Sequence, residues 1–256
     1  MVLLGCGKMG SALLHGWLEG GMDPASITVI EPYPSAWLKE TGVRLNVDLP
    51  QTADVALLAV KPQMMGDALP QLASLEGAMY LSIAAGVSIA AYEDALGASP
   101  IVRAMPNTPA AVGKGITALI ANASATEAQK GMATALLSAV GDVLWLESED
   151  QMDAVTAVSG SGPAYVFHMI EAMTEAGIAE GLPKELATKL AQGTVTGAGA
   201  LAADADESAE QLRINVTSPK GTTEAGLGVL MGEGGLRPLI RATVAAAAKR
   251  SRELGA

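Results

Sequence analysis

The chain has 256 residues, enough for one large domain or two smaller ones with a substantial core. Half of the residues are hydrophobic but only 3% are aromatic, so the core must consist of Ala, Val, Leu, Ile and Met. The net charge of −11 argues against nucleic acid or an anionic membrane surface as a partner.

Signals for export or membrane insertion are not evident in the sequence. The opening MVLLGCG lacks the basic region of a signal peptide. The longest apolar runs, such as residues 244–248, are far shorter than the roughly 20 residues needed to span a bilayer. The single cysteine, Cys6, excludes an internal disulfide and fits a reducing compartment. We therefore expect a cytoplasmic protein.

The first part of the chain alternates apolar, strand-like runs with helical stretches such as residues 10–20. Runs that are apolar on both faces and separated by helices indicate a doubly wound parallel sheet. Strands are predicted at residues 2–4, 27–30, 55–60, 79–83, 101–104, 116–120 and 143–146.

After residue 146 the strand patterns largely stop and helical patterns follow, with Asp or Pro near their starts and Gly near their ends. Helices are predicted at residues 150–162, 164–181, 183–203, 209–216, 223–230 and 237–254. The predicted fold is therefore α/β, with a Rossmann-type sheet domain at residues 1–147 and an all-helical domain at residues 148–256. Gly193, Gly197 and Gly199 would permit close contact between helices, and we expect a helical-domain dimer.

The segment GCGKMG follows the first predicted strand and opens a helix. This is the G-x-G-x-x-G pattern of a dinucleotide-binding loop, in which the glycines allow a tight turn, approach to the pyrophosphate and close helix–sheet packing. The alternative is a glycine-rich turn without a cofactor. We interpret the cysteine as a spacer rather than a nucleophile. The cofactor-binding candidates here are Gly5, Cys6, Gly7, Lys8, Met9 and Gly10.

Glu31 follows the second predicted strand, roughly 20 residues beyond the glycine loop, where an acidic residue typically accepts a hydrogen bond from the adenosine ribose. A carboxylate there would repel a 2′-phosphate, and no arginine stands next to it. This pattern favours NADH over NADPH. The alternative is an exposed loop glutamate without such a role.

A second anion-binding pattern is VTSPKGTTEAG at residues 216–226, where hydroxyls and a glycine precede a helix start. Backbone N–H groups and the helix dipole favour an anion at such a position. Three other segments lie at the ends of predicted strands, where ligands bind in parallel sheets: AVKP at 59–62, AAGV at 84–87 and RAMPNTP at 103–109. The predicted helical domain contains two more, DAVT at 153–156 and SGSGPAY at 159–165.

Together these segments make the chain similar to pyrroline-5-carboxylate reductases. The resemblance implies NADPH- or NADH-dependent reduction of the cyclic imine 1-pyrroline-5-carboxylate to L-proline, the last step of proline biosynthesis. It implies a dinucleotide-binding domain followed by a helical dimerisation domain, and a homodimer or larger homo-oligomer. We expect no metal site. In the family, the helical domain of a neighbouring subunit helps to complete the site.

The resemblance also assigns roles to single residues. It places the substrate carboxylate on the loop at 216–226 and implies that the hydroxyl of Thr223, the catalytic candidate, faces the imine nitrogen. Because a threonine is a poor acid, we assign it an orienting role. The substrate-binding candidates are Ser218, Gly221, Thr222 and Thr223, and the further cofactor-binding candidates are Asn46, Ala59, Val60, Lys61, Pro62, Ala84, Ala85 and Asn215. Asp206 or Glu207 matches an acidic position near the substrate.

The chain departs from the family pattern at one position, and its lysines and loops also bear on two rival functions. Relatives usually read SPGGTT, whereas Lys220 replaces the first glycine here. A 3-hydroxyacid dehydrogenase would need a lysine on the interdomain helix, but the sequence has no lysine or arginine between Lys130 and Lys184. A non-catalytic dinucleotide sensor would have no need of the TSPKGTT loop.

Overall fold

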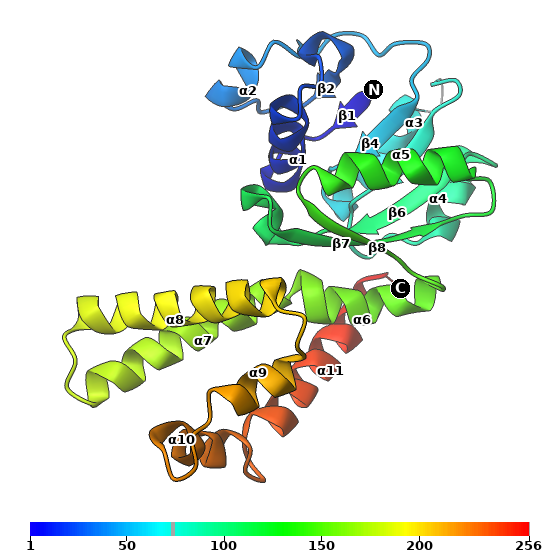
Figure 1. Cartoon of the computed structure of the whole chain (residues 1–256). Helices are drawn as coiled ribbons and strands as arrows, with labels where there is room; N and C mark the ends of the chain where they lie inside the picture. The colour runs from blue at the N-terminus through cyan, green and yellow to red at the C-terminus, as the bar shows by residue number, and fades with distance from the viewer. Residues whose placement is uncertain (73–74, 256) are drawn as a thin grey trace. The chain divides into compact units, whose positions relative to one another are not determined.

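The computed structural model describes residues 1–72 and 75–255 and divides by contacts into two compact units (Figure 1). One unit is Met1–Gly160 together with the end of the chain from Ala247, and the other is Ser161–Ala246. By contacts, residues 148–160 and the end of the last helix belong with the sheet, whereas the boundary predicted from sequence lies after residue 147. A hydrogen bond of 2.6 Å from Ser251 to Asp153 joins these two segments within the first unit.

The first unit is built on one sheet with the strand order β3-β2-β1-β4-β5-β6-β7-β8. The first six strands follow the Rossmann order and are parallel, which confirms the predicted fold class. β7 runs antiparallel to β6, and β8 runs parallel to β7. The strands are β1 (Val2–Leu4), β2 (Thr28–Ile30), β3 (Arg44–Leu45), β4 (Val55–Leu58), β5 (Met79–Ser82), β6 (Ile101–Met105), β7 (Gly115–Ala121) and β8 (Gly141–Trp145).

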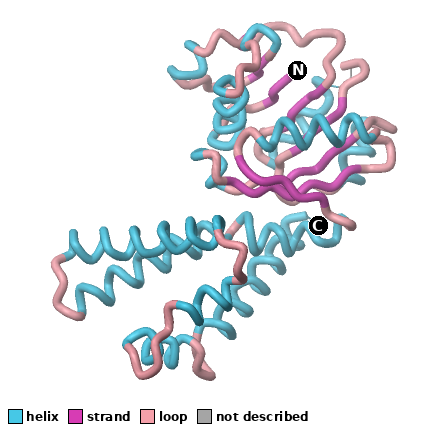
Figure 2. The backbone as a smooth tube through the Cα atoms, viewed as in Figure 1, coloured by secondary structure: helices cyan, strands magenta, loops and turns pink. Residues whose placement is uncertain are grey.

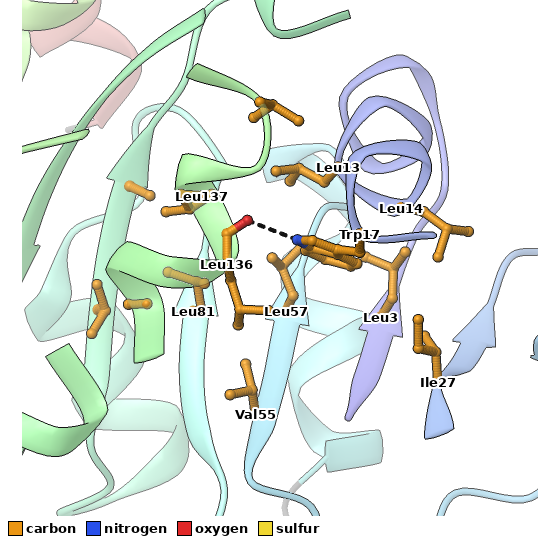
Figure 3. Close-up of a cluster of buried hydrophobic side chains, with 14 of the residues drawn as sticks. Leu3, Leu13, Leu14, Trp17, Ile27, Val55, Leu57, Leu81, Leu136 and Leu137 are labelled. Carbon is orange, nitrogen blue, oxygen red and sulfur yellow. Dashed lines mark hydrogen bonds between the residues drawn. The ribbon is translucent and has the colours of Figure 1, made fainter. Parts of the chain in front are cut away.

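Helices pack on both faces of this sheet because successive strand residues point to opposite faces. In β1, Leu3 joins one hydrophobic cluster while Val2 and Leu4 join the other. The first cluster includes Trp17, whose indole N–H donates to the carbonyl of Leu136 at 2.7 Å (Figure 3). The helices are α1 (Lys8–Glu19), α2 (Ala36–Glu40), α3 (Met65–Leu72), α4 (Ile89–Leu96), α5 (Glu127–Ser138) and α6 (Met152–Val155).

The sequence pattern predicted one helix at residues 150–162, but the structure has three short pieces there. A 3-10 turn at Glu149–Gln151 precedes α6, and a π-helical turn at Thr156–Gly160 follows it. A Cβ at Gly160 would lie 2.5 Å from the methyl carbon of Met105, so this turn packs against the end of β6.

The second unit is entirely helical among its described residues, as predicted (Figure 2). Only Ala187 and Ala191 are buried in it, whereas Phe167, Leu190 and Val229 are more than half exposed. So much exposed apolar surface is typical of a surface that another chain covers. Its helices are α7 (Gly162–Ala179), α8 (Lys184–Asp204), α9 (Ala209–Asn215) and α10 (Thr222–Leu230), followed by α11 (Leu236–Gly255), which returns to the first unit.

Candidate cofactor and substrate site

The three glycines of the loop between β1 and α1 have different surroundings. Gly5 has a φ of +88°, and a Cβ there would lie 2.9 Å from the carbonyl group of Ala59. A Cβ at Gly10 would lie 2.6 Å from the Gly5 carbonyl oxygen. Apart from its two chain neighbours, Gly7 has no heavy atom within 4 Å of its Cβ position, and it is exposed. The loop therefore needs glycine for its turn and its packing, and leaves one open face where a ligand can approach the backbone.

The start of α1 is suited to an anion. Gly7 is the N-cap residue and provides no side chain to cap the helix, and the first turn contains no acidic residue. The first N–H groups of a helix have no intrahelical partners, and here no cap side chain accepts from them, while the helix dipole favours negative charge beside them. Lys8 stands exposed in this first turn. These features fit the pyrophosphate of a dinucleotide.

Cys6, between the first two glycines, is 8% exposed. Burial raises the pKa of its thiol, a contact with the Ser11 hydroxyl lowers it, and the nearby Glu31 charge raises it further. A thiol held protonated is a weak nucleophile, which agrees with a spacer role.

Glu31 points back to the glycine loop. One carboxylate oxygen accepts the N–H of Cys6 at 2.7 Å and the other accepts the N–H of Tyr33 at 2.9 Å. Its backbone exchanges two hydrogen bonds with the side-chain amide of Asn46, which has a φ of +52°. Asn46 therefore contacts the Glu31 backbone directly, a relation that sequence alone did not indicate.

The candidates after β4 and β5 lie at the carboxyl ends of neighbouring parallel strands, where ligands bind in such sheets. Ala59 is linked to β1 by its N–H, which donates to Leu4 at 2.8 Å, and it packs against Gly5. Lys61 and Pro62 begin a 3-10 turn at Pro62–Met64, and Lys61 is exposed. Ala59 and Val60 thus lie next to the glycine loop, and Ala84 and Ala85 follow β5, the strand that pairs with β4. We refer to residues 59–62, 84 and 85 as the wall.

The second loop lies in the helical unit. Lys220 has a φ of +58°, the left-handed conformation that favours glycine, and its N–H donates to the carboxylate of Glu224 at 2.5 Å. Gly221 is the N-cap of α10, and Thr222 and Thr223 form its exposed first turn. Asn215, at the end of α9, accepts a hydrogen bond from Gln211 at 2.8 Å.

A group of buried and partly buried polar residues near Ala84 was not predicted from the sequence. No sequence pattern indicates Ser82, Tyr92 or Glu149, and Arg103 belongs only to the RAMPNTP segment. Arg103 is 8% exposed although it is charged. A charged residue within a predicted buried strand was the one sequence signal for this group.

Comparison with known proteins bears on both units. The family model for the pyrroline-5-carboxylate reductase dimerisation domain matches residues 149–254, and that for coenzyme F420-dependent NADP oxidoreductases matches residues 1–86. A pyrroline-5-carboxylate reductase from Pseudomonas aeruginosa is 41% identical over 99% of this chain and 96% of its own length. The chain belongs to the pyrroline-5-carboxylate reductase family.

Solved structures of the family agree. A reductase from Coxiella burnetii superposes with a TM-score of 0.94 at 40% identity, covering 100% of this chain and 98% of that one. A Plasmodium falciparum reductase, solved with NADP bound, has a TM-score of 0.86 at 30% identity, with 100% and 97% covered. The chain is thus an NAD(P)H-dependent oxidoreductase with a dimerisation domain, as the sequence predicted. In the described part of the chain, no helix is long and apolar enough to cross a membrane.

Proposed function

We propose that this protein reduces 1-pyrroline-5-carboxylate to L-proline with NAD(P)H, as the last step of proline biosynthesis. The observation that carries the proposal is the glycine loop, where Gly7 leaves open space while Gly5 and Gly10 are closely packed. It stands in a chain that matches the family over nearly its whole length.

The residues of the first unit would hold the cofactor. The N–H groups at the start of α1 and the backbone at Gly7 would bind the pyrophosphate, and Glu31 would accept from the adenosine ribose. Ala59, Lys61 and Ala84 would line the nicotinamide. When bound, NAD(P)H supplies the hydride.

The loop before α10 would hold the substrate carboxylate. Ser218 offers a hydroxyl, and the first N–H groups of α10, at Thr222 and Thr223, lie at the positive end of the helix. The Thr223 hydroxyl would orient the imine nitrogen. Because a protonated imine already accepts hydride well, the main task of these residues is positioning. Asn215, directly upstream, would contact the cofactor.

We infer three finer properties from the same residues. Glu31 favours NADH, because its carboxylate would repel a 2′-phosphate. The exposed apolar faces of the helical unit indicate a homodimer or larger homo-oligomer. The net charge of −11 disfavours nucleic acid as a partner, and the single cysteine fits the cytoplasm.

The test is steady-state reduction of 1-pyrroline-5-carboxylate with NADH and NADPH in parallel. We expect turnover with both cofactors and a higher kcat/KM with NADH. Turnover of a 3-hydroxyacid without turnover of the cyclic imine would contradict the proposal and favour the rival dehydrogenase.

A further inference from the structure

A buried polar chain lies behind the loop that follows β5, which carries the Ala84 wall. Ser82 ends β5, Tyr92 lies on α4, and both side chains are fully buried. Their hydroxyl oxygens are 2.5 Å apart. The Ser82 hydroxyl also accepts the N–H of Ala84 at 3.2 Å. The backbone N–H of Ala84 is therefore fixed by the Ser82 hydroxyl, and the Ser82 hydroxyl is in turn fixed by its hydrogen bond with Tyr92.

A partly buried ion pair fixes the other end of this loop. Arg103, the register partner of Ser82 on β6, donates to one carboxylate oxygen of Glu149 at 2.6 Å. The same oxygen accepts the N–H of Ile89, the first residue of α4, at 2.9 Å. The segment 84–88 thus has a polar anchor at each end.

One side of this loop borders an open pocket of about 290 Å³, with Gly86 and Ser88 in its lining. The Cβ position of Gly86 lies 3.5 Å from the carbonyl oxygen of Leu254, so the end of α11 also packs against the loop. The directional hydrogen bonds at both ends of the segment act together with this packing to fix the backbone position. Burial raises the pKa of Tyr92, so its phenol stays protonated and keeps its hydrogen-bonding role at neutral pH.

We propose that Tyr92 is a positioning residue for the reduction. Through Ser82 it holds segment 84–88 so that Ala84 and Ala85 present the correct wall to the nicotinamide ring. The inference rests on the proposed function, which places the ring at this wall. Hydride transfer is sensitive to such positioning, since a displacement of about 1 Å can cost about a hundredfold in rate.

The chain offers a matched control. Tyr80 lies on β5, the strand that also carries Ser82, and is 3% exposed. Its hydroxyl donates to the carbonyl of Leu72 at 3.0 Å, away from segment 84–88. Tyr92→Phe and Tyr80→Phe each remove one buried, hydrogen-bonded hydroxyl. Both should lower the Tm by a similar amount, about 2–6 °C. Only Tyr92→Phe should disturb the wall.

The experiment compares the two variants with the wild-type chain by kcat, by the fluorescence of bound NADH and by the affinity for ADP-ribose, which lacks the nicotinamide. We expect ADP-ribose to bind all three alike. We expect Tyr92→Phe to lower kcat about tenfold and to change the fluorescence of the bound reduced nicotinamide, with Tyr80→Phe within about twofold of wild type. Equal kcat and equal fluorescence in the two variants would overturn the inference.

Ser82 provides a second check. Because Ser82 and Tyr92 act through one hydrogen bond, the double variant Ser82→Ala/Tyr92→Phe should lose no more kcat than the worse single variant. Ser82→Thr, which keeps the hydroxyl, should retain most of the kcat. A double variant whose loss of kcat equals the product of the two single-variant losses would overturn the inference. A wild-type chain that binds NADH without reducing 1-pyrroline-5-carboxylate would contradict the proposed function instead, and the fluorescence comparison would still decide the role of Tyr92.

Discussion

The carboxylate of Glu31 accepts a hydrogen bond from the backbone N–H of Cys6 at 2.7 Å, which ties the end of β2 to the glycine loop. This N–H would otherwise lie unpaired in the turn between β1 and α1. Glu31 therefore fixes the conformation of the glycine loop and also places a negative charge beside it. Each carboxylate oxygen can still accept a second hydrogen bond, so the contact leaves room for a ribose hydroxyl.

Replacing Glu31 should change cofactor preference. We expect Glu31→Ser to raise the ratio of NADPH to NADH use, measured as kcat/KM, about tenfold, because one repulsive or bidentate interaction is worth about 1–2 kcal/mol. Loss of the hydrogen bond to the Cys6 N–H should also weaken the binding of both cofactors. Glu40→Ser, on α2, changes the net charge equally and is the control. An unchanged ratio in Glu31→Ser would mean that another residue sets the preference.

Alanine substitutions at different glycines of the loop should affect either the Tm of the free protein or its affinity for the cofactor. Gly7 has a φ of −68° and open space around its Cβ position, so Gly7→Ala should leave the Tm of the free protein nearly unchanged. Its methyl group would stand where the pyrophosphate approaches, and we expect NAD(P)H affinity to fall at least about tenfold. Titration of cofactor and thermal unfolding give the two values.

Gly10→Ala is the contrasting variant. Its Cβ would lie 2.6 Å from the Gly5 carbonyl oxygen, so the helix must shift from β1. Overpacking of this kind costs about 1–3 kcal/mol, and the Tm of the free protein should fall by several degrees. Equal Tm values for the two alanine variants would show that Gly10 does not pack as closely as the structure indicates.

These loops also show how much the sequence could predict. The glycine loop could be predicted because its backbone conformation and close packing require glycine at fixed positions. β4 could be predicted because four successive buried residues, VALL, form an unbroken apolar run. β3 has only two residues, one of them the exposed Arg44, and offered no such signal. The reversed direction of β7 was not readable, since an apolar run carries no direction.

Contacts set by the tertiary fold were beyond the sequence. Ser82 and Tyr92 lie on different elements, and Ser251 and Asp153 are 98 residues apart, so no local pattern predicts either pair. The comparisons confirm the family and the fold class, whereas the roles of single residues such as Thr223 remain predictions.

Lys220 should carry a measurable conformational cost. A non-glycine residue in the left-handed region costs about 1–2 kcal/mol, offset in part by the greater chain entropy of glycine when unfolded. We expect Lys220→Gly to raise the free energy of unfolding by about 0.5–1 kcal/mol. Lys220→Ala removes the same charge but keeps the Cβ, so it should stay near wild type. Denaturant unfolding compares the three proteins.

Cys6 should make stability fall at alkaline pH. Its folded pKa is raised, so its contribution is fully present below the ordinary thiol pKa of about 8.5 and is lost as pH rises through the higher folded value. Between about pH 8 and 10, the wild-type Tm should therefore fall more steeply than that of Cys6→Ala. Parallel curves would mean that the thiol ionises as freely in the folded chain as in the unfolded chain.

Association of the helical unit should depend on the small residues of α8. Apart from the backbone of its own helix, a Cβ at Gly197 meets no heavy atom within 4 Å, and the same is true of Gly131 on α5 of the sheet unit. Both lie inside helices, where leucine has the higher propensity, so neither Gly197→Leu nor Gly131→Leu should unfold its helix.

If α8 packs closely against a partner chain, the leucine at 197 will separate the two backbones. We therefore expect light scattering at micromolar concentration to show a smaller species for Gly197→Leu and an unchanged oligomer for Gly131→Leu. An unchanged oligomer in both would place the subunit interface elsewhere on the helical unit.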